Sequence, residues 1–138
     1  MKTLIKNLFA ATAVFAISAA NVAAAASALR EHEEINRGLV VIAAGDMIQE
    51  NCATISPRMI KAFAFAQSLQ SLARKDGFSD DEIDAFVRDK VEKNRVKGLA
   101  LDYLVANGVK PDQPATYCTV GLYEIERNSQ IGVLLKAK

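Results

Sequence analysis

The segment from Phe78 to Ile83 predicts the start of a helix more firmly than any other part of this chain. Ser79 and Glu82 have the spacing of a capping box, in which each side chain accepts a hydrogen bond from the other residue's backbone amide. Phe78 and Ile83 occupy the two positions of a hydrophobic staple. We therefore expect a helix that begins at Asp80.

The acidic residues at this helix start have the composition of a cation site: Asp80, Asp81, Glu82 and Asp84. Capping and the positive end of the helix dipole already explain negative charge there. A calcium loop also needs spaced oxygen ligands and a turn glycine, and neither follows in the sequence. We therefore expect no metal site.

Apolar residues recur at helical spacings elsewhere, with start and stop signals between the runs. Ser56 and Pro57 are a start signal, because Ser caps free amides and Pro suits the first helical position. The predicted helices are Gly38–Asn51, Ser56 to Gly77, Asp80–Asn107 with Gly98 as either a bend or a close approach of another helix, and one that begins at Pro114. No strand, repeat or low-complexity segment competes with them. The sequence therefore predicts an all-α, compact, four-helix bundle-like domain.

The N-terminal segment, residues 1–26, has the layout of a secretory signal peptide. Lys2 and Lys6 give a positive start, residues 8–20 are apolar, and residues 21–28 are mostly small. The apolar run is about half of the ~20 residues that a bilayer span needs, so we expect no membrane span in the mature chain. These features predict export to the periplasm, with cleavage after Ala24, Ala25 or Ala26.

Removal of this signal leaves a mature chain from Ser27 to Lys138, whose length suits one domain. Residues 27–37 are charged and weakly patterned, so we expect a flexible lead-in before a single helical domain over residues 38–138. The mature chain has 15 basic and 16 acidic residues, because Lys2 and Lys6 leave with the signal. Proteins that bind nucleic acid usually carry a basic excess, so we expect no nucleic-acid partner.

Cys52 and Cys118 are the only cysteines, and both lie in the mature chain. In an oxidising compartment, an even number of cysteines in a small domain indicates a disulfide. The closed loop would span 66 positions, for which the chain-entropy estimate is roughly 4 kcal/mol of stability. Redox-active or metal-binding thiols are the alternative, but neither cysteine belongs to a Cys-x-x-Cys pair or has a His nearby. The pair therefore predicts one structural disulfide.

Residues typical of catalytic sites are scarce in this chain. The one histidine, His32, lies in the predicted lead-in, which argues against hydrolases that need a base beside a nucleophile. A Cys-x-x-Cys-His haem attachment is absent from the sequence. A pair of catalytic carboxylates would need a cleft, for which so short a mature chain leaves little room. We therefore expect no enzymatic activity and no cofactor.

Five basic residues between Arg88 and Lys97 have the composition of an anion or lipid-headgroup site. Acidic residues three or four positions away suit ion pairs on a solvated helix face instead. The expected pairs are Asp84 with Arg88, Asp89 with Lys93, and Glu92 with Arg95. We favour the solvated face.

Several segments together resemble a known family: Cys52, Ser56-Pro57-Arg58-Met59, Gly77 to Ile83, Cys118, and Ser129 to Leu135. The mature chain is similar to the small exported alphaproteobacterial proteins grouped as domain of unknown function 5333. The resemblance covers Ile35 to the C-terminus and contains no catalytic signature. It implies a periplasmic location, the Cys52–Cys118 bond and no assigned activity.

A helical scaffold without chemical machinery favours a non-enzymatic protein that binds another periplasmic or envelope protein, as an accessory subunit of an envelope complex. The expected contact surface is the apolar segment Asn128–Lys138, whose removal should leave the fold intact. Tyr103, Tyr117 and Tyr123 are candidate exposed aromatics, with half-buried core positions as the alternative. The alternative functions are an acid-activated periplasmic stress chaperone and a carrier of a small apolar ligand.

Overall fold

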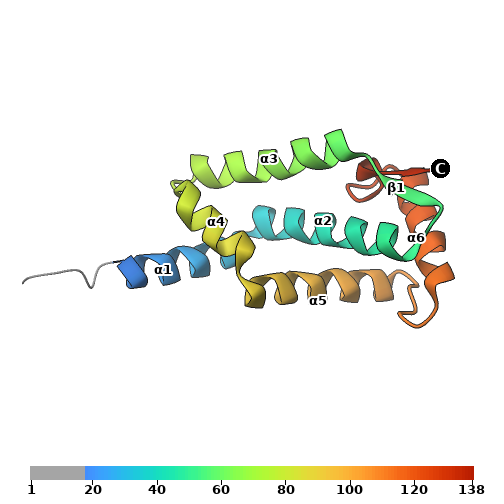
Figure 1. Cartoon of the computed structure of the whole chain (residues 1–138), viewed down its shortest axis with the longest axis horizontal. Helices are drawn as coiled ribbons and strands as arrows, with labels where there is room; N and C mark the ends of the chain where they lie inside the picture. Colours follow the sequence, from blue (N-terminus) through green and yellow to red (C-terminus); the bar gives the residue numbers. More distant parts are fainter. Residues whose placement is uncertain (1–17) are drawn as a thin grey trace, which may run out of the picture.

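The computed structural model describes residues 18–138 (Figure 1). Helices dominate this part of the chain, so the all-α prediction is confirmed. Two short strands, β1 (Ile55–Pro57) and β2 (Leu135–Ala137), and a 3-10 turn at Gly132–Leu134 complete it. Residues 1–17, which hold most of the predicted signal peptide, lie outside the described part. The α-helices in that part are α1 (Ser18–Glu31), α2 (Glu33–Asn51), α3 (Met59–Lys75), α4 (Asp80–Arg88), α5 (Lys90–Ala106) and α6 (Pro114–Glu126).

Three helices form a layer in which α2 lies between α3 and α5 (Figure 1). At one end of the layer α4 crosses from α3 to α5, and α1 packs against α4. At the other end α6 packs against α2, next to the two-stranded sheet. The central helix α2 therefore contacts helices on both sides and at both ends.

Two groups of buried apolar side chains hold these elements together. The larger group lies where α2, α5 and α6 meet, and it includes Ile48, Leu104 and Leu135. The smaller group lies under α4 and includes Leu29 and Phe86. The main core is therefore at the α6 end of the layer.

The predicted disulfide between Cys52 and Cys118 is present. Cys52 caps the C-terminus of α2, and Cys118 lies near the start of α6, with the two Cα atoms 5.1 Å apart. The bond joins the end of the central helix to α6, as the sequence indicated.

The helix predicted over Asp80–Asn107 begins with the expected capping box but is interrupted at Asp89, which ends α4 and caps α5. The Asp89 carboxylate accepts the Glu92 amide at 2.9 Å. This N-cap signal was hidden by the continuous apolar stripe. Gly98 neither bends the helix nor admits a neighbour, because it lies inside α5 with no atom within 4 Å of an added Cβ. The interruption lets α4 cross the end of the layer.

The predicted helix start at Ser56 and Pro57 is wrong, because both residues belong to β1. Strand β1 pairs antiparallel with β2, with Ser56 opposite Lys136 and Pro57 opposite Leu135. The helix α3 starts two residues later, without a side-chain cap. Pairing with the far end of the chain overrides the local start signal here.

The flexible lead-in predicted over residues 27–37 is helical instead, as the end of α1 and the start of α2. His32 separates the two helices, and its side chain accepts the Ile35 amide as the N-cap of α2. The amide of Asn36 donates to the backbone carbonyls of Leu29, Arg30 and His32 across the junction. Side-chain caps therefore order a segment that lacks an apolar pattern.

The C-terminal segment after α6 is part of the core rather than a free surface. Ile131 and Leu134 are buried, and Leu135 is only 1% exposed. The prediction that Asn128–Lys138 forms the contact surface is therefore wrong, and we now expect removal of this segment to disturb the fold. Apolar spacing alone could not distinguish a segment that covers the core from one that is covered by a partner.

Candidate interaction surface

The central helix α2 is apolar on two faces, and the chain covers only one of them fully. Val41, Ala44 and Ile48 lie on the covered face and are buried. A second stripe, at helical spacing, remains partly exposed and consists of Leu39, Ile42, Ala43 and Met47. These side chains pack against the edges of the two buried groups and are only partly covered. The second stripe of α2 is therefore an apolar surface that the chain leaves partly open to water.

Two hollows flank this second stripe. One, of about 500 Å³, lies between α2 and α3, and the other, of about 430 Å³, lies between α2 and α5. Both are lined by Leu39 and Ile42 of α2 and by Phe86 and Val87 of α4. The hollows therefore open on the same face of α2, and we call them together the α2 groove.

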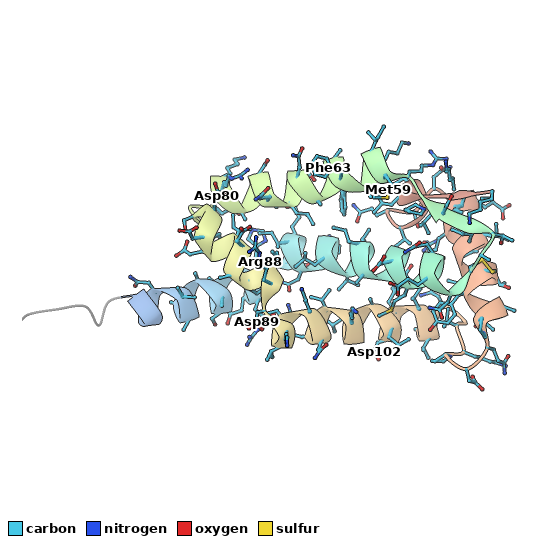
Figure 2. All side chains as sticks on the ribbon, viewed as in Figure 1. Met59, Phe63, Asp80, Arg88, Asp89 and Asp102 are labelled. Carbon is cyan, nitrogen blue, oxygen red and sulfur yellow. A yellow bond between two sulfur atoms is a disulfide. The ribbon has the colours of Figure 1, made fainter. Side chains whose placement is uncertain are left out.

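Helix α3 presents a row of exposed apolar side chains beside the α2 groove. Ile60 is 86% exposed and Phe63 is 65% exposed, and Phe63 also lines the groove. Figure 2 shows Met59 and Phe63 along the same helix. Only the C-terminal half of the apolar stripe predicted for α3 is buried, through Leu69 and Ala73. We call the α2 groove and this α3 row the docking face.

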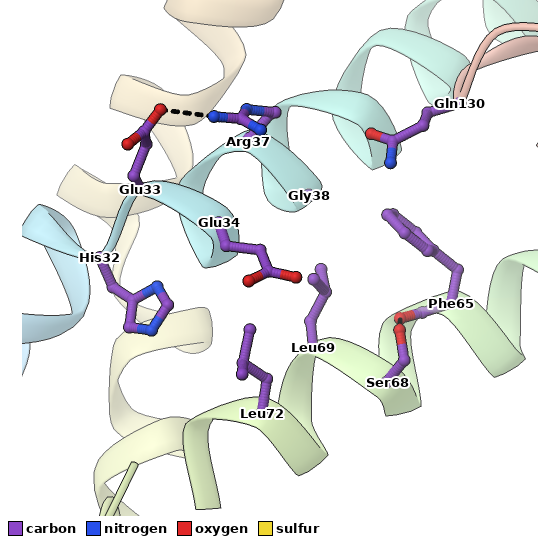
Figure 3. A pocket seen from close by; sticks show the side chains of 10 residues that line it. All are labelled: His32, Glu33, Glu34, Arg37, Gly38, Phe65, Ser68, Leu69, Leu72 and Gln130. Atoms are coloured by element: carbon purple, nitrogen blue, oxygen red, sulfur yellow. Dashed lines mark hydrogen bonds and ion pairs between the residues drawn. The ribbon is translucent and has the colours of Figure 1, made fainter. Parts of the chain in front are cut away.

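A polar cleft of about 630 Å³ lies between the start of α2 and α3 (Figure 3). His32 has both ring nitrogens occupied: Nδ1 accepts the Ile35 amide at 3.3 Å, and Nε2 lies 2.7 Å from a carboxylate oxygen of Asp76. The Ser68 hydroxyl donates to the Phe65 carbonyl at 2.7 Å. The side chains of His32 and Ser68 are thus both engaged in hydrogen bonds within the fold.

The carboxylate of Glu124 is completely buried and fully hydrogen-bonded. Tyr103 donates to it at 2.8 Å, Arg127 donates to both oxygens at 2.7 and 2.8 Å, and the Ser129 hydroxyl donates to it as well. Burial alone would raise the pKa of Glu124, but the bonds from Arg127, Ser129 and Tyr103 outweigh it and lower the pKa. Burial beside Glu124 raises the pKa of Tyr103. This cluster joins α5, α6 and the C-terminal segment.

Glu92 is the second buried carboxylate, with 3% exposure. Arg30 of α1 donates to it at 2.7 Å, and Arg95 of α5 donates at 2.8 Å. Burial opposes ionisation of Glu92, but these bonds outweigh it, so its pKa is lowered. The Glu92–Arg95 pair was predicted from the sequence. The pair with Arg30 could not be predicted from helical spacing, because Arg30 lies 62 residues from Glu92 in the sequence. Glu92 therefore holds α1 against α5.

Only one of the three candidate exposed aromatics is exposed. Tyr123 lies on the surface of α6, where Arg127 covers its ring, with 5.3 Å between the guanidinium carbon and the ring centroid. Tyr117 is buried in the main core, and Tyr103 is half-buried and bonded to Glu124. These side chains do not form a common contact surface.

Within residues 18–138, no helix is long and apolar enough to cross a membrane. The same part of the chain holds no group of three or more His, Cys, Asp or Glu side chains that could bind a metal ion.

The sequence model of a family of unknown function, DUF5333, matches residues 27–136, so the chain belongs to that family. No curated protein and no solved structure matches the chain. The family description names no activity, ligand or partner. Function has to be inferred from the fold and its surfaces.

Proposed function

We propose that this member of the DUF5333 family is a non-enzymatic periplasmic interaction protein, an accessory subunit of an envelope complex, that binds its partner through the docking face. The observation that carries the proposal is the partly exposed apolar stripe of α2, beside exposed Ile60 and Phe63. Contiguous exposed apolar surface on a small domain marks an interaction site. A partner on this face would bury side chains that the chain leaves in water.

The periplasmic part of the proposal is supported by the N-terminal sequence and by the disulfide. The family match begins at residue 27, directly after the predicted cleavage region. A disulfide in a small domain is typical of an oxidising compartment. The expected cleavage bonds at Ala24 to Ala26 lie inside α1, so Arg30 and its bond to Glu92 would remain in the mature chain.

The substitution Phe63→Glu tests this proposal. It places a charge where the α3 row meets the α2 groove, and we expect recovery of the partner from crosslinked host envelopes to fall at least about ten-fold. Because Phe63 is exposed, the free energy of unfolding should change by no more than about 0.5 kcal/mol. Affinity purification followed by quantitative mass spectrometry measures the recovery, and urea unfolding measures the stability.

The matched control is Leu122→Glu, which adds the same charge at an exposed apolar position on α6, outside the docking face. It should leave partner recovery unchanged. If the wild-type protein and Phe63→Glu recover the partner equally, the docking face is not the binding surface.

An acid-activated chaperone is the second candidate, and the two buried carboxylates favour it. Glu92 holds α1 through Arg30, and Glu124 holds the C-terminal segment through the Ser129 hydroxyl. Protonation of these groups would release both ends of the chain from the core. The apolar side chains beneath them would then be available to unfolded proteins.

The pH dependence of stability tests the role of the buried carboxylates. Both folded-state pKa values lie below the unfolded-state value of about 4.3, so their contribution to stability is complete above that pH. It is lost as the pH falls through the lower folded-state values. We expect a constant urea midpoint from about pH 7 to 5 and a steep decline below about pH 4.3.

The double variant Glu92→Gln, Glu124→Gln should start from a lower stability at pH 7 and lose most of the acid dependence. Glu50→Gln, at an exposed position, should follow the wild-type profile. Suppression of client aggregation below pH 4.3 is the activity expected of a chaperone. A wild-type protein that unfolds in acid without suppressing aggregation at any pH would eliminate this candidate.

A further inference from the structure

Two lysines beside the α2 groove have no ion-pair partner in the described part of the chain. Arg88 and Arg95 form the predicted pairs with acidic residues, at 3.2 and 2.8 Å. The predicted pair of Lys93 with Asp89 does not form, because Asp89 caps α5. Lys93 and Lys97 are exposed and line the α2 groove from α5.

Two carboxylates line the same groove from α2. Asp46 and Glu50 lie one and two helical turns after Ile42, on the same side of α2 as the partly exposed apolar stripe. Asp46 accepts a hydrogen bond from Gln49 at 3.0 Å, and neither carboxylate forms an ion pair within residues 18–138. The groove thus has an apolar floor, acidic groups on α2 and basic groups on α5.

The stability of the chain itself does not explain these charges. Glu50 lies in the last turn of α2, next to the negative end of that helix dipole. Lys93 lies at the end of the first turn of α5, near the positive end. Each placement is opposite to the one that the helix dipole favours. Charges that oppose the local dipole and have no partner are suited to binding opposite charges on another molecule.

The shape of the groove fits a helix. From Leu39 to Glu50 the floor of α2 is about 17 Å long at 1.5 Å per residue, which equals three helical turns. Helices α3 and α5 lie on either side of α2 (Figure 1), and a helix packed over the α2 groove would complete a four-helix arrangement. Apolar side chains one turn apart on such a helix could enter both hollows.

We propose that the docking face binds an amphipathic α-helix of a partner protein. Its apolar side fills the two hollows over about three turns, its acidic side chains contact Lys93 and Lys97, and its basic side chains contact Asp46 and Glu50. This inference rests on the proposed function, because it names the segment that occupies the same face.

The test uses three synthetic helical peptides of equal length with one apolar face in common. Their flanking positions carry Glu, Lys or Gln, and fluorescence anisotropy at low salt gives the dissociation constants. All three should bind the wild-type protein. The variant Lys93→Glu, Lys97→Glu should weaken the Glu-flanked peptide about five-fold or more and leave the Gln-flanked peptide unchanged. The variant Asp46→Lys, Glu50→Lys should do the same to the Lys-flanked peptide.

Lys75→Glu, Lys110→Glu is the matched control, since it reverses two exposed lysines outside the groove. It should shift none of the three affinities by as much as two-fold. High salt should reduce the differences between the peptides, because it screens exposed charges.

Two outcomes would overturn the helix inference and leave the proposed function standing. The first is that charge reversal leaves all three affinities unchanged, so that the lysines and carboxylates of the groove play no part in binding. The second is that none of the peptides binds, while a stoichiometric envelope partner still depends on Phe63. A dimer of this chain in sedimentation that Phe63→Glu dissociates would make a second copy the occupant, and would overturn both the helix inference and the envelope partner of the proposed function. Absence of both peptide binding and a Phe63-dependent partner would overturn the proposed function itself.

Discussion

Replacing both cysteines, by Cys52→Ala and Cys118→Ala, should lower the free energy of unfolding by about 4 kcal/mol. The bond closes a loop of 66 positions and connects the end of α2 to α6 at the main core. Without it, the unfolded chain gains the conformational freedom that the loop removed. Because small domains are stable by only about 5–15 kcal/mol, the loss removes a large share of the total. Urea unfolding at pH 7 of the double variant, the wild-type protein and the reduced wild-type protein measures this loss of stability.

Thr54→Ala is the control for this change, because Thr54 lies next to the bridge and its hydroxyl is 3.2 Å from the Cys52 sulfur. It should alter stability by less than about 1 kcal/mol. A doubly substituted protein with the wild-type urea midpoint would show that the bond contributes nothing to the fold.

Ending the chain before Asn128 should have a still larger effect and abolish cooperative folding. The removed segment buries Ile131, Leu134 and Leu135, and burial of each apolar side chain contributes about 1.5–3 kcal/mol. The truncation also removes the hydrogen bond from Ser129 to buried Glu124, and it removes β2, the partner strand of β1. The sum, roughly 5–9 kcal/mol, is comparable to the whole stability of a small domain.

Circular dichroism during heating measures this loss. The control is removal of Lys138 alone, an exposed residue, which should leave a cooperative transition close to that of the full chain. A cooperative transition at the wild-type temperature in the truncated protein would restore Asn128–Lys138 as a free surface segment.

The sequence predicted those features that depend on neighbouring residues. The capping box of Ser79 and Glu82, the left-handed Gly77 after α3, and Pro114 at the start of α6 are all observed. Each is a backbone requirement satisfied within a few residues. The disulfide was also predictable, because two cysteines allow one internal pairing.

Several of the misjudged features depend on contacts between distant parts of the chain, whereas the break at Asp89 and the ordered segment 27–37 depend on local caps. Ser56 has a helix-start signal but pairs with Lys136, near the other end of the chain. Asp89 has the spacing to pair with Lys93 and also the side chain to cap a helix. In the structure it caps α5, and the break there lets α4 cross the end of the layer. The burial of Glu124 requires Tyr103 from another helix. Periodicity identifies an apolar face but not what covers it.

The same limit applies to the docking face. The apolar residues of Gly38–Asn51 predicted a buried helix, whereas the structure leaves Leu39, Ile42 and Met47 only partly covered. The apolar C-terminal segment, predicted as the contact surface, packs on the main core instead. The second stripe of α2 therefore has more apolar surface than this chain covers. A partner over α2 would reconcile its composition with its environment.

The central claim is that another protein covers the docking face in the cell. A photo-crosslinking amino acid in place of Ile60, which is 86% exposed beside the groove, tests it most directly. The same amino acid in place of Tyr123, exposed on α6, is the control. Irradiation of host cells should give one discrete crosslinked envelope protein from position 60 and none from position 123. The same crosslinked products from both positions, or none from position 60, would contradict the account.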